Sequence, residues 1–326
     1  MKPYLTFFPL SFIVGFLLLG ILTNKRLKSS FFRNNENKSV LGGVSLFFSF
    51  MLIFLVFSKY RNGVIPGPLM HILIFSSVVW IFGFLDDLRE LTLFTKIFLQ
   101  VLIVAVFLIK GKKVDIYYFP CWINYIISFL WIVGVTNVFN LLDIGDGLCG
   151  GVSFIVAVSF FIISIASGDY ILAGLFASLC GALLSFLFFN LPPARILMGN
   201  AGSHFLGFLF ATLSMYGDHA TLENPLVLFV PLFILAFPLI DTAYLIIIRI
   251  KKGIVPLRKS NDHILLHLLF SGKNIKSALF SVYFVTLLWG VSGVFLVFGM
   301  NILFLTFVFL AVLFSVRLVF IARGSS

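Results

Sequence analysis

Long apolar runs dominate this sequence and leave few folds open to it. A helix that crosses a bilayer needs about 20 consecutive apolar residues, and eleven candidate runs follow one another along the 326-residue chain. Backbone groups in lipid must hydrogen-bond within the protein, and no barrel-like alternation is present, so the runs are predicted to be helices. We therefore expect an all-α integral membrane protein, a polytopic bundle of about 10–11 transmembrane helices in one domain, residues 1–326. The runs cover residues 4–23, 40–58, 68–85, 92–109, 121–140, 151–167, 170–189, 203–216, 225–248, 278–298 and 301–321.

Composition excludes a soluble protein and argues against a nucleic-acid partner. The chain is 61% hydrophobic and only 11% charged. Its formal charge of +11 comes from basic residues in short loops, without the aromatic-interleaved patch of a nucleic-acid surface. Cys121, Cys149 and Cys180 show neither a disulfide framework nor metal-ligand spacing. The first run is too long for a signal peptide and lacks a small-residue cleavage site, so it is interpreted as a retained span.

The basic residues also predict the orientation. Cytoplasmic loops carry an excess of lysine and arginine, and most of the 23 lie in loops that face the cytoplasm if the N-terminus is outside. Lys110, Lys112 and Lys113 lie on the other side. Loop chemistry confined to one face is typical of an enzyme with a cytosolic substrate, because a transporter needs polar groups near the bilayer centre. The polar loops that share the cytoplasmic face are 82–100, 137–151, 190–207 and 249–277.

Two adjacent carboxylates, Asp86 and Asp87, directly follow the third apolar run. Desolvating two neighbouring carboxylates is costly, so the pair suggests a cation or a cationic partner. A solvated helix end is the alternative. Lys96 and Gln100 are four residues apart and share one helical face, so both can point back at the pair. For Lys96 alone, snorkelling at a helix end is the favoured interpretation.

Four amide or carboxylate side chains lie at a spacing of three, two at the end of the fifth run and two just after it. They are Asn137, Asn140, Asp143 and Asp146, and Gly147 comes next. This spacing places the four on one helical side, and glycine lets backbone approach a ligand closely. A capped helix end is the alternative, but one turn does not need four such groups. The pattern therefore favours a ligand site.

The remaining two polar loops point to phosphate handling. Gly199, Gly202 and Ser203 open the eighth run and could form an anion site at a helix N-terminus, although a glycine-rich loop alone is weak evidence. Asp241 lies inside the ninth run, where an acid is a functional candidate by default, with a structural hydrogen bond as the alternative.

A strongly basic segment follows the ninth run and carries Arg258, His263 and His267. The spacing of the two histidines is that of a helical metal pair, but no third ligand is evident. Phosphate binding by the basic side chains therefore fits this segment better than a zinc site.

In this order, the four loops resemble the polyprenyl-phosphate N-acetylhexosamine-1-phosphate transferase family, glycosyltransferase family 4. The resemblance covers about residues 41–269 and is closer to the enzymes that initiate O-antigen and teichoic-acid linkage than to phospho-MurNAc-pentapeptide translocase. The second loop has the family's Asn-x-x-Asn-x-x-Asp-x-x-Asp-Gly-Leu. The other matching residues are Asp86, Asp87, Leu91, Lys96 and Gln100 in the first loop, Asn190, Pro193, Ala194, Gly199, Gly202, Ser203 and Gly207 in the third, and Pro238, Asp241 and Gly253 before the fourth.

The chain also departs from the family pattern. Asn200 stands where family members have an aspartate that binds magnesium. The family's His-x-His-His is reduced to His263, with Leu265 and Leu266 at the other two positions, unless a one-residue shift lets His267 substitute. The missing histidines argue against the peptidoglycan donor. They favour UDP-N-acetylglucosamine or a deoxy-N-acetylhexosamine.

The resemblance implies a function, a location and partners. The chain is expected to transfer N-acetylhexosamine-1-phosphate from a UDP-N-acetylhexosamine to polyprenyl (undecaprenyl) phosphate and to release UMP, as the first membrane step of cell-envelope polysaccharide synthesis. It is expected in the bacterial inner (plasma) membrane, in contact with membrane lipid and with a cytoplasmic active site. Dimers occur in the family, so a homodimer is one open alternative for the oligomeric state. Mg²⁺ is the expected cofactor and Mn²⁺ the alternative. The competing interpretation is a non-catalytic homologue, or a lipid-linked carrier, that binds nucleotide sugar without transfer.

The resemblance also implies residue roles. Reaction chemistry is assigned to Asp86, Asp87, Asp143 and His263. Metal binding is assigned to the side-chain oxygens of Asn140 and Asn200. The residues expected to bind substrate are Lys96, Asn137, Asp146, Gly147 and Arg258.

Overall fold

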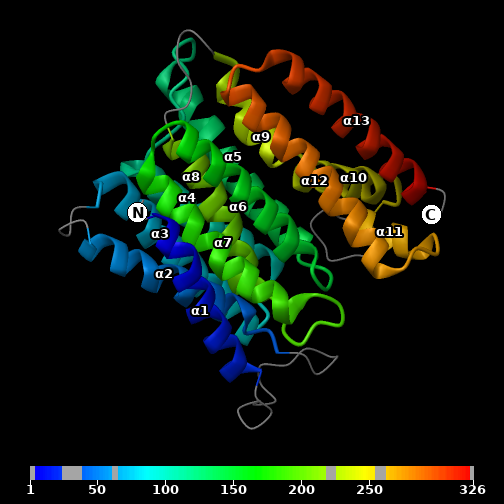
Figure 1. Ribbon diagram of the computed structural model, residues 1–326, viewed down its shortest axis with the longest axis horizontal. Coiled ribbons are helices and arrows are strands. Elements are labelled where there is room, and N and C mark those ends of the chain that lie inside the picture. The colour runs from blue at the N-terminus through cyan, green and yellow to red at the C-terminus, as the bar shows by residue number, and fades with distance from the viewer. Residues whose placement is uncertain (1–3, 24–38, 61–64, 218–224, 254–261, 324–326) are drawn as a thin grey trace.

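The computed structural model describes residues 4–23, 39–60, 65–217, 225–253 and 262–323 of the chain. All regular elements in these ranges are helices, apart from one isolated parallel bridge between Ser39 and Ile196. The helices are shown in Figure 1. They are α1 (Tyr4–Leu22), α2 (Gly42–Tyr60), α3 (Gly67–Leu88), α4 (Leu93–Lys110), α5 (Cys121–Leu142), α6 (Leu148–Ala166), α7 (Tyr170–Asn190), α8 (Gly199–Tyr216), the 3₁₀ helix η3 (Pro225–Phe229), α9 (Val230–Ile234), α10 (Ala236–Lys251), α11 (Ile264–Phe270), α12 (Ile275–Val297) and α13 (Asn301–Arg323).

The helix starts follow from local sequence. Thr92 precedes α4 and its hydroxyl accepts a hydrogen bond from the backbone N–H of Thr95 at 3.2 Å. Asp169 caps α7 in the same way, and Asn274 caps α12. Such side chains replace the hydrogen-bond partners that the first N–H groups of a helix lack. Pro66 and Pro120 stand directly before α3 and α5.

The predicted all-α membrane architecture is confirmed. Each of the eleven apolar runs lies on a helix or a helix pair. By length and composition, seven described helices could cross a membrane, or eight if a bent pair is one span. The number is below the predicted 10–11 because the apolar parts of α1 and α2 are shorter and α8 opens with polar residues.

The ninth run differs from the prediction of one continuous span over 225–248. Its two parts, Leu226–Ile234 and Ala236–Lys251, are bent by 65° relative to each other. Pro238, near the start of α10, has no N–H to donate to the carbonyl four residues earlier, which favours a break at this point. The seven-residue helix α11 was not predicted within the basic segment.

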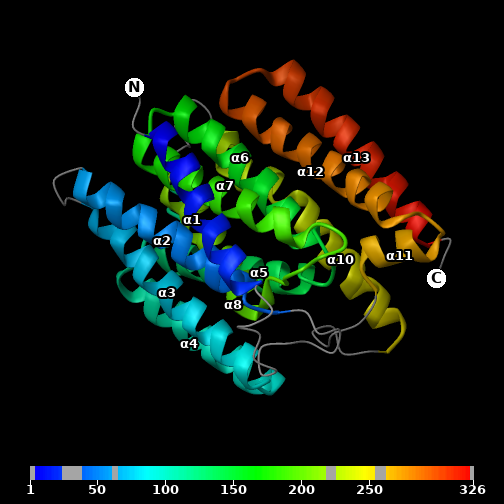
Figure 2. The ribbon, with the colours of Figure 1, turned by 60° about the horizontal axis from the view of Figure 1, so that its bottom comes forward.

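The helices α6 and α7 lie between two groups, α2 with α3 on one side and α12 with α13 on the other (Figures 1 and 2). The apolar window of α7 is 83% buried, whereas that of α13 is only 17% buried. The inner helices form the core, and α13 presents most of its apolar surface outward, as lipid contact requires.

Candidate active site

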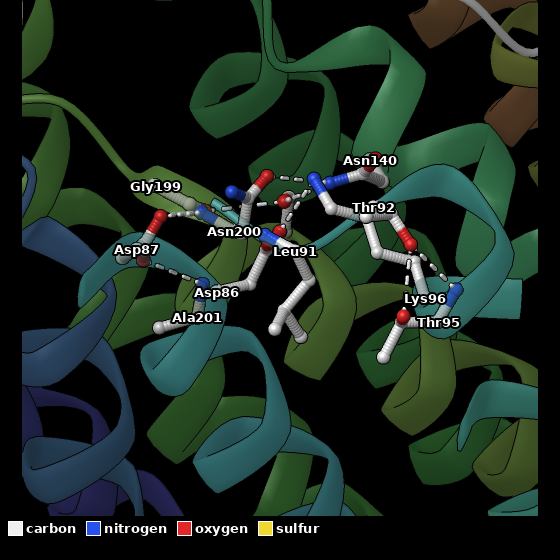
Figure 3. A network of polar contacts seen from close by, with 11 residues as sticks. Asp86, Asp87, Leu91, Thr92, Thr95, Lys96, Asn140, Gly199, Asn200 and Ala201 are labelled. Carbon is white, nitrogen blue, oxygen red and sulfur yellow. Dashed lines mark hydrogen bonds and ion pairs between the residues drawn. The ribbon is translucent and has the colours of Figure 1, made fainter. Parts of the chain in front are cut away.

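The acidic pair lies at the C-terminal end of α3, and Asp86 has partners nearby in sequence. Asp86 is buried, and its Oδ1 accepts a hydrogen bond from the backbone N–H of Leu91 at 2.9 Å. Its Oδ2 lies 2.8 Å from the Nζ of Lys96, on the first turn of α4 (Figure 3). The prediction that Lys96 points back at the pair is therefore confirmed. An ion pair inside the protein offsets the desolvation of this carboxylate.

Asp87 has a different partner, the N-terminus of α8. Its two carboxylate oxygens accept hydrogen bonds from the backbone N–H groups of Asn200 at 2.8 Å and Ala201 at 2.9 Å (Figure 3). No side chain of the preceding segment caps α8, so Asp87 from α3 caps it instead. The carboxylate also interacts favourably with the positive end of the helix dipole. The anion at this predicted N-terminal anion site is thus the protein's own Asp87.

Three glycines allow the helices to come this close. Gly199 has φ +74°, and a methyl group there would lie 2.7 Å from Asp87 Oδ2. A methyl group at Gly83 would lie 2.5 Å from the carbonyl oxygen of Asn200, and one at Gly43 would lie 2.6 Å from the Cα of Gly202. The neighbours of Gly83 and Gly43 are backbone atoms that cannot rotate away, and the positive φ of Gly199 itself favours glycine. Glycine is therefore required where α2 and α3 approach the start of α8.

The structure brings together the two residues predicted to bind metal. The Nδ2 of Asn140, near the end of α5, donates hydrogen bonds to Asn200 Oδ1 at 3.0 Å and to Ser203 Oγ at 3.2 Å. Figure 3 shows the two amides facing each other beside the acidic pair. The ends of α3 and α5 and the start of α8 thus meet at one place. Their side chains there offer mainly oxygen atoms.

Asn137 lies one helical turn before Asn140 and contacts α4. Its Nδ2 donates to Gln100 Oε1 at 2.9 Å and to the carbonyl oxygen of Val133 at 2.8 Å. The polar residues of the first and second loops therefore form one continuous set. The assignment of Asn137 to substrate stays a prediction.

The loop after α5 is fastened to the loop after α7. Asp146 Oδ2 accepts from the backbone N–H of Ala194 at 2.9 Å. The N–H of Gly147 donates to Asn190 Oδ1 at 2.9 Å. The carbonyl oxygen of Gly147 accepts from the hydroxyl of Tyr283 at 2.6 Å. Gly147 has φ +79°, which other residues adopt rarely. Asp143 follows the last turn of α5 and is partly buried.

Tyr283 was not identified from the sequence. It lies in α12, 136 residues after Gly147, and no motif surrounds it. A methyl group at Gly151 would lie 2.2 Å from the ring carbon Cζ of Tyr283, so the glycine at 151 makes room for the tyrosine. The glycines after Asp146 are the available signal, because they indicate that another group approaches the backbone there.

His263 directly precedes α11 and is buried. Its Nδ1 lies 2.7 Å from Asp241 Oδ2, so two sequence candidates form one contact. His267, on α11 outside the membrane-spanning helices, is also buried, and burial lowers its pKa below the ordinary value, with Asp262 opposing the shift. A lowered pKa favours neutral imidazole at physiological pH. Arg258 lies outside the described residues.

Comparison with known proteins identifies relatives. Residues 69–218 match the sequence model of glycosyl transferase family 4. A Bacillus subtilis protein named "Probable undecaprenyl-phosphate N-acetylglucosaminyl 1-phosphate transferase" is 28% identical over 283 residues, 84% of this chain and 77% of that protein.

Two further relatives match over shorter lengths. An undecaprenyl-phosphate alpha-N-acetylglucosaminyl 1-phosphate transferase of Thermotoga maritima is 30% identical over 62% of each chain. A phospho-N-acetylmuramoyl-pentapeptide-transferase of Heliobacterium modesticaldum is 40% identical, over 32% of this chain and 35% of its own length.

Proposed function

We propose that this chain, which matches the model of glycosyl transferase family 4 over residues 69–218, transfers N-acetylhexosamine-1-phosphate from a UDP-N-acetylhexosamine to undecaprenyl phosphate. The observation that carries this proposal is the meeting of α3, α5 and α8, which places Asp86, Lys96, Asn140 and Asn200 around one point of a multi-pass membrane protein. Phosphoryl transfer asks a protein mainly for positioning and charge neutralisation. The names of the Bacillus and Thermotoga relatives support N-acetylglucosamine as the sugar.

The proposed reaction is a single displacement. An oxygen of the lipid phosphate forms a bond to the phosphorus that carries the sugar, while the bond from that phosphorus to the bridging oxygen of the pyrophosphate breaks. UMP leaves with the electron pair, so the lipid diphosphate sugar and UMP are the only products. Asp86 would orient the attacking lipid phosphate, and Lys96, already beside it, would neutralise phosphate charge. Asp143 and Asp146 are proposed to position the nucleotide on the cytoplasmic side, and Gly147 to bind substrate beside Asp146. Asp87 is proposed to engage the reacting phosphates and His263 to neutralise phosphate charge.

Magnesium is the proposed cofactor, with manganese the alternative. Asn140 and Asn200 fit a hard cation in ligand type, because both carry side-chain oxygens. Asn140 presents its nitrogen to Asn200 in the structure, so its amide has to turn before both oxygens face one ion. The pair brings no negative charge, and the described residues contain no group of three or more His, Cys, Asp or Glu suited to a metal. A bound cation would neutralise charge on the reacting phosphates.

The Asn200→Asp variant is expected to need about tenfold less Mg²⁺, because ligand charge raises affinity for hard cations. Two measurements test this. One is the Mg²⁺ concentration that gives half-maximal UMP release, and the other is the rise in unfolding midpoint as Mg²⁺ is titrated. Asn137→Asp is the matched control, since it adds the same charge one turn from Asn140 where the side chain contacts Gln100. An unchanged Mg²⁺ requirement in Asn200→Asp, or an equal effect in the control, would contradict the metal assignment.

The function itself is tested by UMP release from purified protein with undecaprenyl phosphate, Mg²⁺ and a panel of UDP-N-acetylhexosamines. Release that requires both lipid and donor, and that is fastest with UDP-N-acetylglucosamine, is expected. Saturable binding of UDP-sugar without UMP would indicate a non-catalytic homologue. Accumulation of substrate in sealed vesicles without UMP would indicate a carrier. Homodimer formation stays a prediction.

A further inference from the structure

The contact between Asp241 and His263 attaches the residues just before α11 to α10. Both side chains are about 1% exposed. Asp241 Oδ2 lies 2.7 Å from His263 Nδ1, and Asp241 Oδ1 accepts from the backbone N–H of Ile264 at 2.9 Å. The two oxygens of Asp241 therefore hold two consecutive residues, His263 through its side chain and Ile264 through its backbone.

A second contact holds the segment just before α11. Here the acidic residue lies in that segment, and its basic partners lie at the end of α10. Asp262 is buried, and its Oδ1 lies 2.7 Å from Lys252 Nζ. Its Oδ2 lies 4.0 Å from the Nε of Arg249, a fully buried arginine two turns after Asp241 on α10. Anchoring of α11 is thus shared between Asp241 and Asp262. Of these two carboxylates, Asp241 is the one that contacts the imidazole of His263.

The anchored stretch lies against the proposed nucleotide loop. A methyl group added at Gly145, between Asp143 and Asp146, would lie 3.3 Å from Leu265 Cδ2. Leu265 is two residues after His263, on the first turn of α11. The position of His263 relative to that loop therefore depends on how α11 sits on α10.

The geometry also fixes the chemical form of the imidazole. A carboxylate oxygen can only accept a hydrogen bond, so Nδ1 of His263 must carry the proton. Nε2 is then the ring nitrogen left to meet a substrate group. A carboxylate that holds one ring nitrogen sets both the tautomer and the orientation of a working histidine.

From these contacts we propose that Asp241 is a positioning residue for the sugar-phosphate transfer: it accepts the Nδ1 proton of His263 and so directs Nε2, which donates to a phosphate oxygen when it carries a proton of its own, to the phosphates of the donor. This inference rests on the proposed function, in which His263 acts on phosphate. A role of Asp241 in anchoring α11 alone is the competing explanation. The two differ in whether the effect of Asp241 passes through the ring of His263.

A double-mutant cycle separates them. The Asp241→Asn variant is expected to lower kcat for UMP release about 100-fold, with the KM for the UDP-sugar little changed, because an amide no longer selects the working ring form. In a His263→Gln background the same substitution is expected to cost less than about twofold. Asp262→Asn is the matched control. It makes the same chemical change in the other anchor, and its cost is expected to be the same with and without His263.

Nitrogen-15 NMR of the histidine rings, assigned with His263→Gln, gives a readout independent of turnover and of any Asp241 variant. The intact protein is expected to show His263 protonated at Nδ1, and Asp262→Asn is expected to preserve that form. An Nε2 proton alone on His263 in the intact protein, or equal costs of Asp241→Asn in both backgrounds, would overturn the proposal while leaving the transfer function standing. Absence of UMP release from the intact protein with every donor would overturn both.

Discussion

Replacing Asp86 by Asn is expected to lower UMP release about 1,000-fold or more, while the protein remains folded. The carboxylate is buried, holds Lys96 at 2.8 Å and accepts the N–H of Leu91. An amide of the same shape keeps an acceptor for Leu91 but loses the charge that holds Lys96. In the proposed reaction, that charge also orients the lipid phosphate. The measurement is UMP release at saturating donor and lipid, together with the thermal unfolding midpoint in detergent.

Asp169→Asn is the matched control for this variant. Asp169 caps α7 by accepting from the N–H groups of Ile171 and Leu172, at the opposite end of the bundle from Asp86. Asparagine caps helices about as well as aspartate, so turnover and stability are both expected to stay near those of the unchanged protein. Near-normal turnover by Asp86→Asn would remove Asp86 from the reaction. A collapse of the unfolding midpoint would make its charge a requirement for folding instead.

Gly83→Ala is expected to reduce turnover about 100-fold, although residue 83 touches no substrate in the proposal. The added methyl group would meet the carbonyl oxygen of Asn200 at 2.5 Å and the Cα of Ala201 at 2.8 Å. These backbone atoms can yield only if the start of α8 moves away from α3, and a shift of about 1 Å at reacting groups can cost about 100-fold. Overpacking is also expected to lower the free energy of unfolding by about 1–3 kcal/mol.

Gly134→Ala shows whether any alanine at a helical glycine has this effect. A methyl group at Gly134, inside α5, has no neighbour within 4 Å, so alanine there is expected to leave turnover unchanged and to stabilise the helix by about 0.5–1 kcal/mol. The comparison requires kcat, KM and the unfolding midpoint of each variant. Full turnover by Gly83→Ala would mean that the site tolerates displacement of α8. The contact between Asn140 and Asn200 would then not be required for turnover.

The membrane architecture could be predicted because run length decides whether a helix can cross a bilayer. The bend between α9 and α10 could not, because the prolines of that run interrupt an otherwise continuous apolar stretch without saying how far the axis turns. Lys96 was found because it lies four residues before Gln100, on one face of the helix that follows Asp86. Gln100, which the same spacing directed at the acidic pair, contacts Asn137 instead. The transmembrane helices and the position of Lys96 could both be inferred from residues that are close together in the sequence.

Contacts between distant segments were harder to infer. The meeting of Asn140 and Asn200 came only from the family resemblance, and spacing gave no sign that Asp87 would cap α8. That contact depends on how closely α3 and α8 pack. Asp262 and Tyr283 were missed because nothing adjacent to either residue marks a partner on α10 or in the loop after α5.

The capping of α8 by Asp87 also sets an order of assembly during synthesis. Lys96 leaves the ribosome almost together with Asp86, whereas the N–H of Asn200 comes 113 residues after Asp87. At translation rates of about 5–20 residues per second, Asp87 waits roughly 6–23 s for its partner. During that time α3 is present in a nascent chain that has no α8, and Asn140 has no Asn200. The newborn protein thus completes its proposed reaction centre late, when α8 docks against α3 and α5.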